Sequence, residues 1–158
     1  MLRERQIYSV LDRVLAVVQI VFGFGLLIAL VIEAVTPGPD RRPLEVVLGI
    51  VVAAITIVAG VLLWRGRRAG LALSLGVQLF QVLPVIVAHT AVRYVAGLHW
   101  TLRFGGARIW QPWGLEGTFI ILHDDRGFPT TVIGLNVVAL VAALYLVGRL
   151  KDLRKTQQ

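Results

Sequence analysis

Four polar residues in or beside long apolar segments are the strongest candidates for chemistry in this sequence. They are Glu33, His89, Arg93 and Asn136. A charged or strongly polar side chain inside a bilayer is costly, so it usually faces a partner or a functional cavity. His89 and Arg93 are four residues apart and would share one face of a helix. We therefore expect the four residues to line an outward-facing polar pocket, with His89 as its titrating group.

The same four residues also have a purely structural explanation. Hydrogen bonds between helices stabilise membrane proteins by about 0.6 kcal/mol per contact, and they need polar side chains of this kind. Other polar residues within the apolar segments suit the same role, namely Gln19, Thr56, Gln78 and Gln81. The sequence leaves both interpretations open.

Recognisable catalytic and cofactor motifs are missing from the sequence. The absence of Cys excludes disulfides, thiol catalysis, Cys-ligated zinc and iron–sulfur clusters. The triplet His123-Asp124-Asp125 carries metal-ligand side chains, but it is also ordinary turn chemistry before Arg126-Gly127. We predict no metal and no cofactor. An enzyme is the weaker hypothesis, and it would use His89 and Glu33 as acid and base.

The composition indicates the kind of element that must position these residues. Hydrophobic residues make up 57% of the 158-residue chain and charged residues 16%, whereas an ordinary soluble domain has about 45–50% and about 25%. A soluble single-core protein and a disordered chain are therefore excluded. A bilayer-spanning helix needs about 20 mainly apolar residues. Four segments satisfy this length, and we predict transmembrane helices over residues 14–35, 45–64, 69–95 and 130–149.

Residues 97–129 form a long connection between the third and fourth predicted helices. Apolar and polar residues alternate over 100–104, and a second strand-like run covers 117–122. We expect a small sheet of two or three strands here. Four tryptophans suit the membrane–water interface: Trp64, Trp100, Trp110 and Trp113. The predicted fold, over residues 1–158, is an all-α integral membrane domain: a four-transmembrane-helix bundle with a small extracytoplasmic β element.

Small residues and one proline bear on how the predicted helices pack. Each span has two small residues four apart, which would allow close helix approach. Pro84 is expected to kink the third helix, because it cannot donate a backbone hydrogen bond. The four pairs are Gly25 with Ala29, Gly49 with Ala53, Gly70 with Ser74, and Ala139 with Ala143.

The distribution of basic residues predicts the orientation in the membrane. Ten Arg and Lys residues precede the first span, join the second to the third, or follow the fourth, whereas six lie on the other side. The positive-inside rule then places both termini in the cytoplasm of a multi-pass protein of the cell membrane. Contact with anionic lipids at the cytoplasmic face follows. Nucleic acid is not an expected partner, since no basic patch is interleaved with exposed aromatic residues.

The functional hypotheses follow from this architecture. We expect an accessory or stabilising subunit that packs against other membrane protein subunits, because the apolar helices carry close-packing residues and no catalytic motif. The alternative is a binder or carrier of a lipid or another small hydrophobic molecule through the outer pocket. The high Arg, Ala, Val and Gly content is typical of a bacterial protein, and hence of a bacterial inner membrane.

Overall fold

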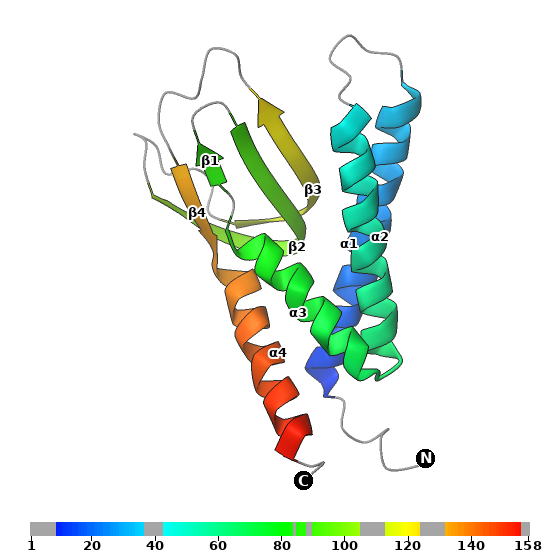
Figure 1. The fold of residues 1–158 in the computed structure, drawn as a ribbon, viewed down its shortest axis with the longest axis vertical. Coiled ribbons are helices and arrows are strands. Elements are labelled where there is room, and N and C mark those ends of the chain that lie inside the picture. The colour runs from blue at the N-terminus through cyan, green and yellow to red at the C-terminus, as the bar shows by residue number, and fades with distance from the viewer. Residues whose placement is uncertain are drawn as a thin grey trace.

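The computed structural model describes residues 9–36, 43–83, 85–87, 90–104, 113–123 and 132–155. Its four helices form two pairs (Figure 1). α1 (Val10–Val35) and α2 (Pro43–Trp64) make a long hairpin, while α3 (Arg68–Val82) and α4 (Val137–Lys155) make a shorter pair. The start of α1, the α2–α3 turn and the last turn of α4 all lie on one side of the molecule, which we call the basal end. The opposite, distal end carries a β sheet.

Two glycines bring α1 and α2 close together. A Cβ atom on Gly60 would lie 2.9 Å from the carbonyl oxygen of Ala16, and one on Gly23 would lie 2.8 Å from Cγ1 of Ile57. The predicted pair Gly25 and Ala29 is not used inside the bundle, because both residues are exposed. The helices therefore meet along a different face of α1 from the one that the small-residue spacing suggested.

The turn between α2 and α3 is compact. Gly66 has a φ of 70°, and Arg67 N donates to Leu62 O at 3.0 Å while Gly66 N donates to Leu63 O at 2.9 Å. This is a Schellman motif, in which a left-handed glycine ends the helix. Gly70 then lies directly against the backbone of α2, since a Cβ there would be 2.3 Å from Leu63 N.

The third helix is shorter than predicted. α3 ends at Val82, so the prediction of a helix to residue 95 is wrong. Pro84 follows within two residues and disfavours helical geometry at the residue before it. The next residues include Val85, Ile86 and Val87, which are β-branched and favour strands. The proline ends the helix instead of kinking it.

A four-stranded antiparallel sheet is formed by the part of the chain between α3 and α4. Its strands are β1 (Val85–Val87), β2 (Thr90–Phe104), β3 (Trp113–His123) and β4 (Val132–Asn136), in the order β1-β4-β2-β3 with an extra β1–β2 pairing. The sheet is larger than the expected two or three strands. It also takes the start of the predicted fourth helix, so α4 begins at Val137 and not at residue 130. The prediction of an all-α fold is therefore wrong for the four described strands.

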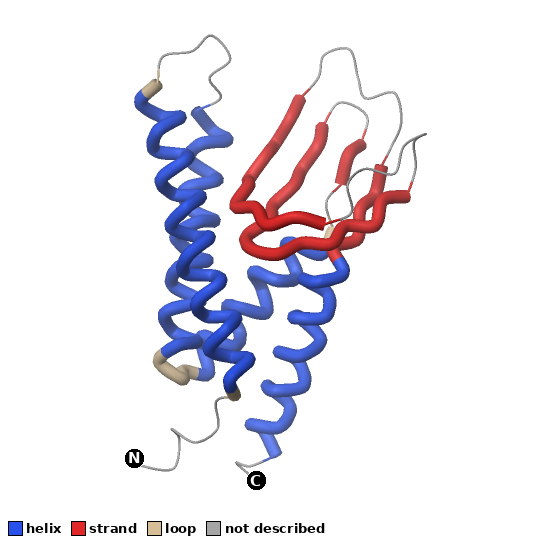
Figure 2. Tube along the Cα trace, turned by 180° about the vertical axis from the view of Figure 1, so that it is seen from behind, coloured by secondary structure: helices blue, strands red, loops and turns tan. Residues whose placement is uncertain are grey.

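β2 curls back on itself. Val92 and Phe104 are twelve residues apart along β2, which is about 40 Å of extended strand. Val92 pairs with Val85, Val85 with Ile133, and Ile133 with Phe104. Three strand spacings are only about 14 Å. The strand must therefore bend strongly, and Figure 2 shows the sheet turning sharply.

The two longest helices have a strongly apolar outer surface. Large apolar side chains are exposed along α1 and α2, for example Val21 at 57% and Val51 at 49%. The interior combines an apolar core with buried polar residues, namely Asp12, Gln19, Thr56, Ser74, Gln78, Gln81 and Asn136. α1 and the Val46–Trp64 part of α2 are long and apolar enough to cross a membrane.

Candidate functional site

The most extensively hydrogen-bonded buried group in the described part of the chain is the Asp12 carboxylate. Ser9 N and Arg149 Nη2 donate to its Oδ2 at 2.9 and 3.1 Å, and the Tyr145 hydroxyl donates to its Oδ1 at 2.9 Å. Ser9 Oγ also contacts the Tyr145 hydroxyl. Asp12 itself is fully buried, so this basal cluster holds a buried charge with a guanidinium and two further donors.

Local sequence positions each member of the basal cluster. Ser9 caps α1 and accepts from Asp12 N at 3.3 Å, while Asp12 bonds back to Ser9 N, which completes a capping box. Tyr145 and Arg149 are four residues apart on α4 and therefore share a face. The cluster ties the start of α1 to the last turns of α4.

Polar side chains bridge a wide separation between α1 and the other helical pair. No Cα atom of α1 lies within 8 Å of a Cα atom of α3 or α4. Across this separation Ser74 Oγ donates to Gln19 Oε1 at 2.9 Å, and Asp12 bonds to α4 as described. We call this boundary the polar seam. The Gln19 Nε2 group is buried there with no hydrogen-bond acceptor in the described structure.

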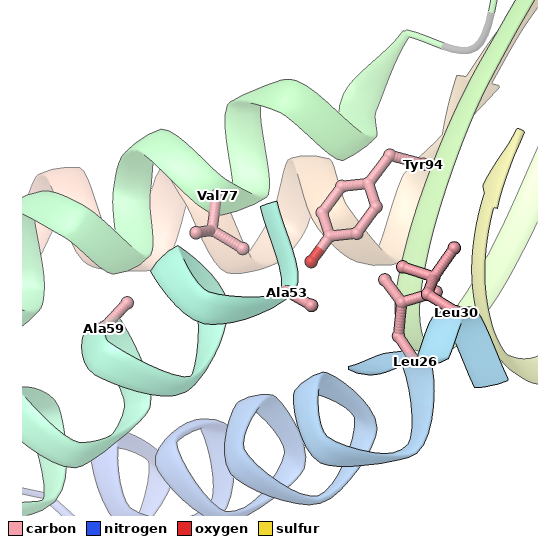
Figure 3. Packing of buried hydrophobic residues seen from close by; sticks show 6 residues of the cluster. All are labelled: Leu26, Leu30, Ala53, Ala59, Val77 and Tyr94. Carbon is pink, nitrogen blue, oxygen red and sulfur yellow. The ribbon is translucent and has the colours of Figure 1, made fainter. Parts of the chain in front are cut away.

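The sheet is joined to the helices by Tyr94. Figure 3 shows its ring extending from β2 among α1, α2 and α3, in the cluster that contains Leu26 and Leu30. The Thr56 hydroxyl donates to Val52 O at 2.8 Å, so its single proton is already used. The Tyr94 hydroxyl must then be the donor in its hydrogen bond to Thr56 Oγ1. Tyr94 therefore holds β2 against the middle of α2.

The predicted outer pocket is only partly within the described residues. Glu33 is exposed on the last turns of α1, whereas Asn136 is buried, and Asn136 Oδ1 accepts from Ala139 N at 3.3 Å as the cap of α4. Arg93 lies on β2 opposite Ile120, so it is not on a helix, and its predicted helical pairing with His89 has no basis. His89 lies outside the described residues. Glu33 and Asn136, the two candidates whose side chains are described, are not hydrogen-bonded to each other.

Three of the four predicted interfacial tryptophans lie in described elements. Trp64 ends α2 at the basal end and is 55% exposed. Trp100 and Trp113 are direct cross-strand partners in β2 and β3. Trp110 lies outside the described residues. Within the same residues no group of three or more His, Asp or Glu side chains is arranged to hold a metal ion.

Sequence reasoning missed the basal cluster. Its signal is present in the pattern Ser9-x-x-Asp12 directly before an apolar run, which is typical of a capping box. Asp12 lies just before the first predicted span, and its partners on α4 come more than 130 residues later. Local spacing can identify the cap, but only the fold reveals that the same carboxylate binds α4.

Comparison with protein-family models, with curated proteins and with solved structures finds no match to this chain.

Proposed function

We propose that the chain is a multi-pass protein of the bacterial cell membrane that acts as an accessory or stabilising subunit of a larger membrane complex. The observation that supports the membrane placement is the apolar outer surface of α1 and α2. Soluble monomers seldom expose apolar patches larger than a few hundred Å². Here large apolar side chains cover the outside of two long helices, while amides, hydroxyls and a carboxylate are buried beside the apolar core. Lipid is the solvent that suits such a surface.

Basic residues support an orientation with both termini in the cytoplasm. Eight Arg and Lys residues of the described chain lie at the basal end: Arg13, Arg65, Arg67, Arg68, Arg149, Lys151, Arg154 and Lys155. The positive-inside rule assigns such an end to the cytoplasm. In this orientation the sheet is on the extracytoplasmic side of the bundle, and α3 and α4 enter the bilayer from the cytoplasmic face.

The outer face of α1 supports the role of a packing subunit. Gly25 and Ala29 are exposed, and a Cβ on Gly25 would meet no atom within 4 Å. Small residues four apart allow the close approach of a second transmembrane helix. The chain's own helices leave this face of α1 uncovered, so we propose that a helix of another subunit packs there.

Native mass spectrometry of the chain purified in mild detergent tests the proposal. We expect a stoichiometric protein partner to co-purify with the wild type and to be lost from Gly25→Leu. The matched control is Gly76→Leu on α3, which is the same change at another open position. A chain that purifies alone would contradict the subunit role. A defined small-molecule mass on that lone chain would favour the binder or carrier instead.

A further inference from the structure

Two exposed basic segments lie at the basal end. Arg65 and Arg67 flank the glycine of the α2–α3 turn, and Lys151, Arg154 and Lys155 occupy the last turns of α4. One apolar cluster lies beneath both segments. It contains Leu153 of α4 together with Leu63 of α2 and Leu71 of α3. α4 packs against α3, so the end of α4 is held at the same end of the molecule as the α2–α3 turn, although no Cα atom of α4 lies within 8 Å of one of α2.

The positive charge of this surface is not neutralised within the described chain. Among the described residues of the basal end, eight are basic and two are acidic, Asp12 and Asp152. Asp12 is buried and already holds Arg149. Arg65, Arg67, Lys151, Arg154 and Lys155 are exposed, so their charged groups are available to an anion.

We propose that these two segments together form a binding site for an anionic phospholipid with two phosphate groups, from the cytoplasmic leaflet. The arginines at both segments present planar donor forks that match phosphate oxygens. Two adjacent basic segments fit two linked phosphates better than one. The inference rests on the proposed membrane placement, because it needs the basal end to lie at the headgroup level. It adds a lipid partner that the subunit role does not require.

Native mass spectrometry from nanodiscs provides the test. The discs contain equal amounts of a two-phosphate phospholipid, phosphatidylglycerol and phosphatidylcholine. We expect wild-type chain to retain the two-phosphate lipid selectively. Arg67→Gln and Arg154→Gln should each lower that retention by about fivefold, the effect of one basic residue at an anionic surface. The double variant should lose the selectivity.

The control variant is Arg13→Gln, which removes one exposed basic residue from α1 at the same end. We expect less than a twofold effect from it. An equal loss in all three single variants would overturn the site in favour of a diffuse charge effect. Equal retention of all three lipids would overturn it as well. Retention of inorganic phosphate alone in place of the lipid would also overturn it, because that result would indicate a site for the free anion.

The experiment separates failure of this inference from failure of the proposed function. A chain that does not enter nanodiscs refutes the membrane placement and this site with it. A chain that enters the discs without lipid selectivity refutes only the site. The subunit proposal is tested by the Gly25 variants, which do not touch the basal end.

Discussion

Gly70→Ala tests the close contact between the start of α3 and the end of α2. The added methyl carbon would lie 2.3 Å from Leu63 N, 2.4 Å from Leu62 C and 2.7 Å from Leu63 Cα. All three are backbone atoms, so no side-chain rotation relieves the overlap. Overpacking costs about 1–3 kcal/mol where side chains can adjust. Without that adjustment we expect a loss at the upper end of this range, about 3 kcal/mol, which exceeds the gain of about 1 kcal/mol from replacing a helical glycine.

The assay is thermal unfolding in detergent, followed by far-ultraviolet circular dichroism and tryptophan fluorescence. A net loss of about 2 kcal/mol corresponds to a fall in Tm of about 4–8 °C for a chain of this size. Gly76→Ala is the control, because a Cβ there meets no atom within 4 Å and the helix should become slightly more stable. An equal or higher Tm for Gly70→Ala would refute the packing of α3 against α2 described above.

Three further substitutions test the polar interior by the same unfolding measurement. Asp12→Ala leaves the Arg149 guanidinium without its carboxylate, so we expect the free energy of unfolding to fall by about 3–5 kcal/mol and the effect to be strongly non-additive with that of Arg149→Ala. Additive losses would contradict a direct interaction between Asp12 and Arg149. Tyr94→Phe should lower the free energy of unfolding by only about 1 kcal/mol, since Thr56 keeps its own hydrogen bond within α2. A loss above about 3 kcal/mol would show that the Tyr94 hydroxyl stabilises the fold by more than this one hydrogen bond. Gln19→Leu removes the unsatisfied Nε2 donor but also the acceptor of the buried Ser74 hydroxyl, so we expect the free energy of unfolding to fall by about 1–3 kcal/mol. An unchanged stability would mean that the bond between Ser74 and Gln19 contributes nothing.

The helical part of the fold could be predicted well from the sequence. Apolar length alone places α1 and α2 to within a few residues, because a helix with no internal Pro and few polar groups has no competing structure. The end of α3 was less predictable. A single proline in an apolar helix can bend it or end it, and the β-branched residues that follow decide between the two.

The candidate site was less accessible to sequence reasoning than the fold. A polar residue in an apolar segment identifies a position that needs a hydrogen-bond partner. The spacing along the sequence predicts that partner only when both residues lie on the same helix. Asp12, Gln19 and Tyr94 each bond to an element far away in the chain. The expected pairing of His89 with Arg93 assumed that both lie on a helix. The helical argument does not apply once Arg93 belongs to a strand, because positions four apart are separated by about 13 Å along a strand but by only about 6 Å along a helix.

If the chain spans a membrane as proposed, the lengths of its elements explain why it needs its sheet. α1 has 26 residues and is about 39 Å long, enough for a hydrocarbon core of about 30 Å, whereas the 15 residues of α3 reach only about 22 Å. Tyr94 packs with Leu26 and Leu30, which lie about 14 and 8 Å below the distal end of α1. If α1 crosses the bilayer as proposed, this part of β2 lies at the depth of the outer leaflet.

A strand at that depth must have its backbone groups satisfied by protein, because lipid offers no hydrogen bonds. The curled sheet meets this condition on one side, since β1, β2 and β4 each pair with the other two. The remaining edge belongs to β3, which pairs with β2 on one side and contacts α1 and α2. The ring of strands therefore does for α3 and α4 what extra helical turns do in an ordinary span, because it continues the fold toward the outer surface.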